Sequence, residues 1–283
     1  MPELPEVEST RRHLSPVMEG ARVEALHLGK PLRWPLVPDG EAPPAVSGLS
    51  IGAMSRRGKY IWMPLTGDLL QPAQGLLWHL GMSGALRWWP AGQSIEPPGP
   101  HDHAILQTRS GELRLTDPRR FGAVVWSAGI DQDPCRQLLS RLGPEPWDES
   151  LDASTFWHTL KRHRTPIKQT LLAGKAVVGV GNIYCSEALF RARIHPATRS
   201  DKLTRAQAGR LLDCVRETLA SALDAGGSTL RNYRGADGEP GAFQQIAQVY
   251  GRENLPCVVC SQPIRTLVQQ GRRTYFCGHC QGR

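Results

Sequence analysis

The amino-terminal stretch MPELPEVEST places a proline and a glutamate directly after the first methionine. Removal of Met1 would leave Pro2 with a free secondary amine, and an α-amino group titrates near neutrality, with a pKa of about 7.7 to 8.0. Such an amine attacks an aldehyde-like carbon to give an iminium ion, and the adjacent Glu3 carboxyl group can protonate a leaving oxygen or a ring oxygen. The alternative is an inert N-terminal proline, so these two residues alone leave the question open.

Four of the seven cysteines follow the spacing C-x2-C-x16-C-x2-C, which is typical of a zinc site. Each C-x2-C step brings two thiolates to one side of a tetrahedral ion, and the intervening residues allow a β-hairpin with Gln270 and Gly271 near its tip. The alternative is a disulfide pairing, which a cytosolic setting disfavours. We expect one structural Zn2+ ion, held by Cys257, Cys260, Cys277 and Cys280.

The stretch VVGVGNIYCSE, residues 177–187, looks like a dinucleotide-binding loop at first sight. It lacks the third glycine, and no parallel-sheet pattern surrounds it. A glycine-rich turn that opens into a helix at Asn182 can still donate backbone N–H groups to one phosphate. A plain turn between helices is the alternative, and the stretch alone does not decide between the two.

Two short loops bounded by strand-like sequence carry residues that are unusual for a turn. They are LGMSG (80–84) and TDPRRFG (116–122), with a methionine, two arginines and a phenylalanine. In one interpretation Met82 and Phe121 pack in a core. In the other, an arginine and two apolar wedges enter the space that a flipped base vacates.

Charge is distributed unevenly along the 283 residues. Residues 1–150 hold 15 Lys and Arg against 17 Asp and Glu, a net charge of −2, whereas residues 151–283 hold 19 against 9, a net charge of +10. This excess in the C-terminal half, mostly arginine, favours an anionic partner. No apolar run approaches the roughly 20 residues of a membrane span, and the acidic N-terminus lacks the basic region of a secretory signal. We therefore expect a soluble cytoplasmic protein.

The secondary structure that must position these residues is predicted to change from strands to helices along the chain. From Arg22 to about Ser127 the sequence predicts short β-strands, for example over 59–65, over 76–80, and as a pair around a turn at Ser110 and Gly111. A sandwich or barrel is the natural closure for such strands. After GPEPWDES (143–150) the pattern becomes helical, with a capping box at Thr204 and Gln207.

Several motifs occur in the order found in the formamidopyrimidine-DNA glycosylases, and the resemblance covers essentially the whole chain. They are PELPEVE, RRGKY, HLGMSG, HDH at 101–103, TDPRRFGA, GVGNIYCSE, QVYGRENLPC and the cysteine hairpin. The resemblance implies an α+β multidomain protein that holds DNA between its halves. The implied domains are an N-terminal β-sandwich with an N-terminal helix (1–142), a linker (143–150), a helix-two-turns-helix domain (151–245) and a zinc finger (246–283).

The implied activity is that of a bifunctional DNA glycosylase and AP lyase. It would excise 8-oxoguanine and formamidopyrimidines from duplex DNA through a Schiff base on Pro2, followed by β,δ-elimination. Glu3 would be the proton donor in base release, Lys59 the proton donor in β-elimination, and Arg272 a phosphate-binding residue tied to δ-elimination. The partner would be double-stranded DNA with oxidised bases or abasic sites, bound by a monomer that is associated with the nucleoid.

The resemblance also implies a set of DNA contacts, in which Met82, Arg119 and Phe121 fill the gap left by the extruded base. The full set is His79, Met82, His101, Arg119, Phe121, Arg164, Lys168 and Asn182. The glycine-rich segment 233–243 would cover the extruded base. Arg164 and Pro166 depart from the family pattern, as does the segment LLQPAQG before β-like residues 76–80.

Two alternatives remain. An endonuclease VIII-like enzyme for oxidised pyrimidines typically begins Pro-Glu-Gly-Pro-Glu, whereas Leu4 occupies the third of these positions here. A non-catalytic protein that only binds damaged DNA would be expected to lack Pro2, Glu3 or Lys59, and all three are present.

Overall fold

The computed structural model describes residues 2–37, 45–67, 74–93, 95–228 and 242–282. Its contacts divide the chain into two compact units. The first contains Met1–Arg141 and Gly226–Gly241, and the second contains Leu142–Ala225 and Ala242–Arg283. Among the described residues, no helix combines the length and the apolar character needed to cross a bilayer.

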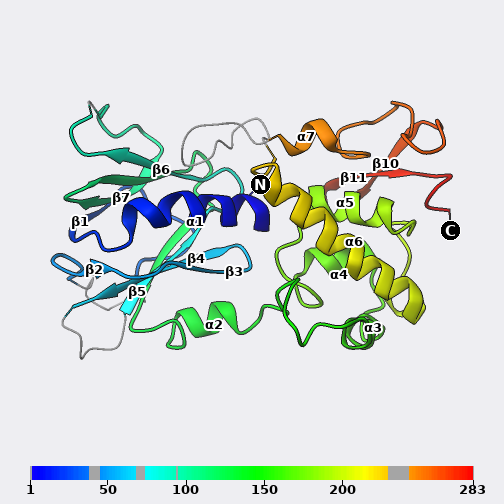
Figure 1. Ribbon diagram of the computed structural model, residues 1–283, viewed down its shortest axis with the longest axis horizontal. Helices are drawn as coiled ribbons and strands as arrows, with labels where there is room; N and C mark the ends of the chain where they lie inside the picture. Colours follow the sequence, from blue (N-terminus) through cyan, green and yellow to red (C-terminus); the bar gives the residue numbers. More distant parts are fainter. Residues whose placement is uncertain (1, 38–44, 68–73, 94, 229–241, 283) are drawn as a thin grey trace. The chain divides into compact units, whose positions relative to one another are not determined.

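The first unit begins with a long helix, α1 (Leu4–Met18), which Figure 1 shows in dark blue. Glu3 is the residue that caps its N-terminus, and Pro5 lies in the first turn, where a missing N–H costs no hydrogen bond. The side chains of Val7, Leu14 and Met18 are buried. One face of α1 therefore packs into the core of the unit, and the start of the helix has a fixed place.

Two antiparallel sheets form the rest of this unit, as the predicted sandwich requires. One has the order β1-β7-β8-β6, and the other has the order β2-β4-β5-β9 with β3 paired to β4. The first sheet consists of β1 (Val23–Leu28), β6 (Ala85–Pro90), β7 (Asp102–Thr108) and β8 (Gly111–Thr116). The second consists of β2 (Ser50–Ile51), β3 (Ser55–Arg57), β4 (Tyr60–Thr66), β5 (Gln74–His79) and β9 (Ala123–Ser127).

A single apolar core joins these elements. It contains residues of α1 and of both sheets, such as Leu14, Leu106 and Trp78. A short helix, α2 (Cys135–Leu139), follows the last strand, and Cys135 packs with Leu77 in a smaller cluster on the other face of the second sheet. The strands confirm the predicted β-rich N-terminal half, and the turn between β7 and β8 lies at Arg109 and Ser110, one residue before the predicted position.

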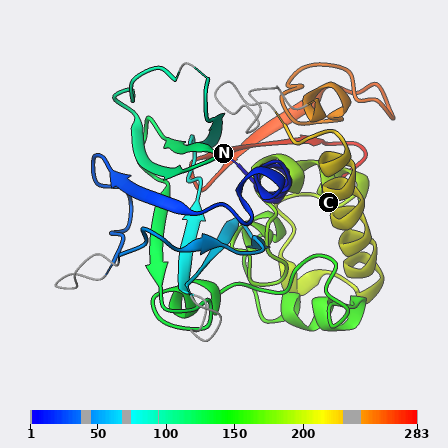
Figure 2. The same ribbon diagram turned by 60° about the vertical axis from the view of Figure 1, so that its left-hand side comes forward.

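The second unit is helical, as predicted from about residue 151 onwards. Its helices are α3 (Ala153–Lys161), α4 (Ile167–Leu172), α5 (Asn182–Arg191), α6 (Arg205–Asp224) and α7 (Phe243–Ile246), with a 3-10 turn at Ser200–Lys202. Pro166 separates α3 from α4, and the predicted capping box of Thr204 and Gln207 begins α6. Figure 2 shows α6 in yellow as the longest helix of this unit.

A hairpin of β10 (Ile264–Gln269) and β11 (Arg272–Cys277) completes the second unit. Gln270 and Gly271 form its tip and both have positive φ, of 49° and 70°. The carboxylate of Glu187 on α5 accepts hydrogen bonds from the backbone N–H groups of residues 248, 249 and 250 at 2.9, 2.9 and 2.7 Å. This buried acid fixes the chain that leads from the helices into the hairpin.

Candidate functional site

The N-terminal pair is held in one position by an acid of the first helical turn. Pro2 is buried and Glu3 is 1 % exposed. The Glu3 N–H donates to Glu6 Oε2 at 2.8 Å, while Glu6 Oε1 accepts from the Ser228 N–H at 2.7 Å and from its hydroxyl at 3.0 Å. Gly227, at φ 87°, passes so close that a Cβ there would lie 3.0 Å from Glu6 Oε1.

An acid in the first turn of a helix, such as Glu6, interacts favourably with the helix dipole. In the structure it ties the residues before α1 to a segment more than 200 positions away. The acid three positions after the capping residue was the available signal for the local half of this role. No local sequence pattern marks Ser228 as a hydrogen-bond partner of Glu6.

Lys59 lies half-buried in the tight turn between β3 and β4, next to Gly58, whose φ is 59°. The guanidinium group of Arg56 supports this turn: Nη1 donates to the Gly58 carbonyl at 2.9 Å, and Nε donates to Glu8 Oε2 at 3.1 Å. Glu8 belongs to α1, which also positions Pro2 and Glu3. The two parts of the proposed active site are therefore attached to one helix.

Glu8 is the acid at the centre of an arginine cluster. Its carboxylate also accepts from Arg11 at 2.7 Å and from Arg12 at 2.9 Å. Burial acts to raise the pKa of Glu8, but the hydrogen bonds and positive charges of Arg11, Arg12 and Arg56 outweigh it and lower that pKa to about 2. The carboxylate is consequently ionised at neutral pH and binds the turn of Lys59 electrostatically.

His79 ends β5, and its ring is half-buried against Tyr60, with ring centroids 4.7 Å apart. Burial, together with the nearby charges of Lys59 and Arg33, lowers the pKa of His79 to about 4. The ring is neutral at pH 7, and its Nδ1 accepts from the Gly81 N–H at 3.1 Å. His79 thus buttresses the loop that carries Met82.

The two loops singled out in the sequence carry their apolar side chains on the surface of the unit. Met82 is 36 % exposed and Phe121 is 38 % exposed, so the interpretation as core residues is wrong. The Arg119 guanidinium carbon lies 4.8 Å from the centre of the Phe121 ring. His101 is also exposed, and its carbonyl accepts from the Asp117 N–H at 2.8 Å. Exposed apolar tips beside an arginine can wedge into a nucleic acid duplex.

The sequence did not single out Asp117, the acid behind these loops. It is fully buried, and its carboxylate accepts three hydrogen bonds from the residues around Met82 and Phe121. The only available signal was its place in the motif TDPRRFG.

In the second unit, two predicted residues, Asn182 and Lys168, meet at the hairpin. The Asn182 side chain donates to the Arg273 carbonyl at 3.0 Å, and Lys168 Nζ lies 3.5 Å from the same oxygen. Lys168 also donates to the hydroxyl of Thr274 and is fully buried. In this arrangement the ammonium group of Lys168 fixes the hairpin instead of extending into solvent.

Arg272 begins β11 and lines a cavity of about 380 Å³ together with His163, Thr165 and Lys175. Arg164, which lies between His163 and Thr165 in the sequence, is exposed. Cationic and hydroxyl side chains around one hollow match the chemistry of a phosphate group. The glycine-rich segment 233–241, predicted to cover the extruded base, lies outside the described residues.

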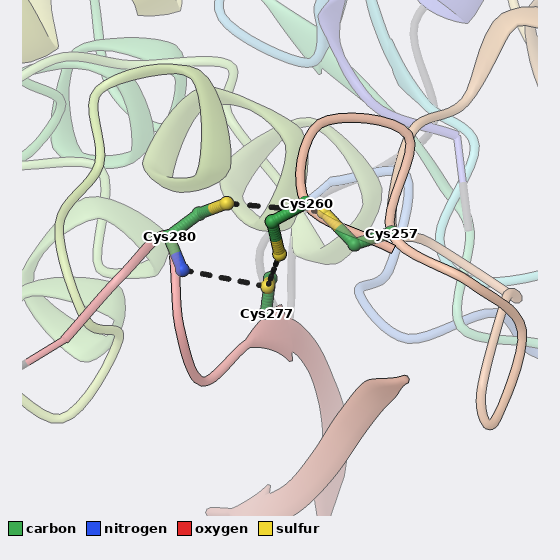
Figure 3. A group of neighbouring side chains, drawn as sticks. All are labelled: Cys257, Cys260, Cys277 and Cys280. Carbon is green, nitrogen blue, oxygen red and sulfur yellow. Dashed lines mark hydrogen bonds between the residues drawn. The ribbon is translucent and has the colours of Figure 1, made fainter. Parts of the chain in front are cut away.

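The four predicted metal ligands converge at the base of the hairpin (Figure 3). Their sulfur atoms all lie within 4.8 Å of one another, with Cys260 and Cys277 3.5 Å apart and Cys257 and Cys280 3.9 Å apart. All four are free thiols, so the disulfide alternative is wrong. Sulfurs at the corners of a tetrahedral zinc site with bonds of about 2.3 Å would be about 3.8 Å apart, which fits this cluster.

Comparisons with known proteins agree with these features. Residues 1–124 match the formamidopyrimidine-DNA glycosylase N-terminal domain, and residues 142–234 match the H2TH domain of the same enzymes. Residues 254–282 match the zinc finger found in FPG and IleRS. The formamidopyrimidine-DNA glycosylase of Albidiferax ferrireducens is 49 % identical over 281 residues, which is 99 % of both chains. The chain belongs to the formamidopyrimidine-DNA glycosylase family.

Other members of the family support this assignment. The Bordetella petrii glycosylase is 49 % identical, with 100 % of both chains covered. The crystal structure of MutM (Fpg) from Thermus thermophilus matches with a TM-score of 0.86 and 40 % identity, covering 99 % of both chains. A Lactococcus lactis Fpg variant in complex with DNA containing Fapy-dG matches with a TM-score of 0.88 and 33 % identity over 100 % of both chains. The family, the glycosylase class and the zinc finger predicted from the motifs are thereby confirmed.

Proposed function

We propose that this chain is a bifunctional DNA glycosylase and AP lyase that excises oxidised purines from duplex DNA. The observation that carries the proposal is the fixed, buried pair of Pro2 and Glu3 at the start of α1, with Lys59 attached to the same helix through Arg56 and Glu8. The L. lactis relatives crystallised with DNA containing Fapy-dG or an abasic site support the same substrate class.

In the proposed first step, the amine of Pro2 attacks C1′ of the damaged nucleotide. The C1′–N bond breaks, the base leaves, and Glu3 donates the proton that base release and opening of the sugar require. An iminium ion then links Pro2 to C1′. Glu3 suits the role of proton donor because it follows Pro2 directly and is held in place at the start of α1.

Strand cleavage follows from the iminium ion, which makes the C2′ proton acidic. Loss of that proton expels the 3′ phosphate by β-elimination, with Lys59 as the proposed proton donor on the 3′ side. A second elimination expels the 5′ phosphate, and Arg272 stabilises its charge. The product is a gap of one nucleotide with a phosphate at each end.

The remaining predicted residues are assigned to DNA binding. Met82, Arg119 and Phe121 fill the space left by the extruded base, and His79 and His101 flank them. Arg164, Lys168 and Asn182 serve phosphate binding, with Lys168 acting through the hairpin. We also propose that the borders 1–142, 143–150, 151–245 and 246–283 separate functional domains, and that a monomer acts on the DNA of the cytoplasm.

The decisive experiment is borohydride trapping with a duplex that contains 8-oxoguanine opposite cytosine. The wild-type protein with a free Pro2 amine should give a covalent protein–DNA complex, and Pro2→Gly should reduce its yield sharply. Retention of Met1 or an N-terminal tag should abolish trapping, because the amine becomes an amide. Absence of a trapped species from correctly processed wild-type protein would contradict the mechanism and favour a protein that only binds damage.

A matched pair of variants tests the acid. Glu3→Gln should reduce base release while leaving cleavage of a ready-made abasic site largely intact. The exposed Glu24→Gln should behave as wild type in both assays. Equal loss of both activities in Glu3→Gln would contradict its role as proton donor in base release.

The second candidate, an enzyme for oxidised pyrimidines, has one observation in its favour. An L. lactis Fpg was crystallised with DNA containing an oxidised pyrimidine. A panel of duplexes with oxidised purines and pyrimidines, measured in single turnover, ranks the two lesion classes. Faster excision of the pyrimidines would reverse our assignment.

A further inference from the structure

Asp117 follows the last residue of β8 and is fully buried. One carboxylate oxygen, Oδ1, accepts from the Ser83 hydroxyl at 2.6 Å and from the Arg119 N–H at 3.2 Å. The other, Oδ2, accepts from the Gly122 N–H at 2.7 Å. Ser83 follows Met82, whereas Arg119 and Gly122 bracket Phe121. A single carboxylate therefore binds both wedge loops, residues 80–84 with Met82 and residues 116–122 with Phe121.

The same residue reaches a third motif through its backbone. The Asp117 N–H donates to the carbonyl of His101, at 2.8 Å. The loops of Met82 and Phe121 and the HDH motif are thus joined at one residue, although they lie up to 34 positions apart in the sequence.

Close backbone contact leaves the two loops little room to move separately. Gly81 has a φ of 64°, and a Cβ at this position would lie 2.4 Å from the Gly122 nitrogen. A Cβ at Gly122 would in turn lie 3.0 Å from the His79 carbonyl oxygen. Any shift of one loop therefore displaces the other, and the hydrogen bonds of Asp117 set their common position.

We propose that Asp117 is a positioning residue that holds Met82, Arg119 and Phe121 in the one arrangement that fills the gap of an extruded base. The proposal rests on the proposed function, since the gap exists only in a duplex with a flipped nucleotide. Asp117 touches neither the reacting sugar nor the base. Its contribution is to keep the wedges assembled before DNA binds.

The chemistry of the site requires a carboxylate. All three partners are donors, and a carboxylate is an acceptor at both oxygens. In Asp117→Asn, one end of the side chain becomes an NH2 group that faces either the Gly122 N–H or the Ser83 and Arg119 donors. The variant keeps the shape of the side chain, but at least one bond is replaced by a contact between two donors.

The test compares two substrates in single turnover. The first is a duplex with 8-oxoguanine opposite cytosine, which presents a gap to fill. The second is a single strand with an abasic site, which has no opposite base and no gap. Asp117→Asn should lower the rate on the duplex by about 100-fold, the size of loss expected from a small misplacement remote from the chemistry. Its rate on the single strand should stay within about threefold of wild type.

Two further variants sharpen the comparison. Ser83→Ala removes one of the three bonds and should give a smaller loss on the duplex only. Asp133→Asn changes an exposed acid of the same unit, which binds Arg136 and Gln137, and should match wild type on both substrates.

The outcomes distinguish failure of the positioning role of Asp117 from failure of the proposed glycosylase function. Equal loss on duplex and single strand in Asp117→Asn would show a general structural role and overturn the proposal, as would an unchanged rate on the duplex. Wild-type protein that processes neither substrate would contradict the proposed function itself and the positioning role with it. A circular dichroism melt of Asp117→Asn verifies that the variant used in the comparison is folded.

Discussion

The N-terminus and the wedge loops of the sandwich unit are held by one kind of hydrogen bond, and the hairpin of the second unit is held by another. In the sandwich, buried carboxylates accept from backbone N–H groups, as Glu6 and Asp117 do for the N-terminus and the wedge loops. At the hairpin, side-chain donors reach backbone carbonyls, as Asn182, Lys168 and Gln269 do. Each functional segment is therefore fixed by its backbone, which leaves its side chains available for a substrate.

The two regions also differ in the apolar core behind them. The core of the sandwich draws on α1 and both sheets. The core at the hairpin has five buried members, Phe190, Val249, Cys257, Ile264 and Cys277, and two of these are metal ligands. We expect a region this small to depend on its metal for a stable fold, and the larger sandwich core to be stable without one.

Zinc removal should produce the largest effect and separate the two regions. Cys257→Ala, or a strong chelator, removes a site whose binding free energy is about 10 kcal/mol or more, so the hairpin should unfold. DNA affinity should then fall by about 100-fold or more, a loss of about 2.7 kcal/mol, since Arg272 loses its place. Fluorescence anisotropy measures the affinity, and metal analysis measures the zinc.

The control is Cys214→Ala, which changes a buried thiol outside the metal cluster and should retain zinc and DNA affinity. The sandwich should melt at an unchanged temperature in the zinc-free protein. A common melting transition that shifts with zinc would refute the contrast between the regions.

Loss of the Glu8 carboxylate should be the next largest effect, and it should fall on the sandwich. Glu8→Gln leaves Arg11, Arg12 and Arg56 without their shared partner, which should cost about 3 kcal/mol at pH 7. Because the folded-state pKa is about 2, below the ordinary value of 4.5, this stability is complete above about pH 4.5. It is lost as the pH falls from there to about 2.

Urea unfolding of Glu8→Gln across this pH range measures the effect. The difference from wild type should shrink as the pH falls. Glu24→Gln, whose ion pair with Arg109 is exposed, should change the free energy of unfolding by less than about 1 kcal/mol. A constant difference between Glu8→Gln and wild type at pH 7 and pH 2.5 would show that the charge of Glu8 is not the cause.

The parts of this structure that the sequence predicted are those with local signals. The capping box at Thr204, the turns at Ser110 and Gln270, and the cysteine spacing each depend on residues a few positions apart or on a fixed metal geometry. The β-favouring residues between turns likewise predicted short strands, which a sandwich or barrel would close.

The contacts that hold the functional segments in place could not be predicted in the same way, because the two partners of each contact are distant in the chain. Glu8 binds Arg56 across 48 positions, and Lys168 binds Thr274 across 106. No local pattern marks such a pair. The sequence shows Lys168 as a cationic residue in a family motif, which predicts a direct contact with DNA. It does not show the Arg273 carbonyl and the Thr274 hydroxyl, which bind the ammonium group in the folded chain.

A smaller effect should appear when His79 is protonated. Its folded-state pKa of about 4 lies below the ordinary value of 6.5, so the folded state favours the neutral ring. The stability from this preference is complete above about pH 6.5 and is lost as the pH falls towards about 4. Protonation of Nδ1 also removes the acceptor of the Gly81 N–H.

NMR titration of the histidine ring signals measures this pKa directly. His79→Gln should remove the corresponding part of the pH dependence of unfolding between pH 6.5 and 4. A His79 that titrates near 6.5 would show that the loop of Met82 does not depend on a neutral ring.

The smallest effect should come from Asn182, and it tests how the hairpin is used. Asn182→Ala removes one hydrogen bond to the Arg273 carbonyl, worth about 1 kcal/mol, and should weaken DNA binding by about fivefold. Asn182 is neutral, so losing a direct phosphate contact from it would leave the salt dependence of binding unchanged. If Asn182 acts by orienting Arg272, one cationic contact is lost as well, and the slope of log affinity against log salt should become shallower by about 0.9. An unchanged slope would assign Asn182 to the phosphate itself, and the hairpin would then owe its orientation to Lys168, Gln269 and the metal.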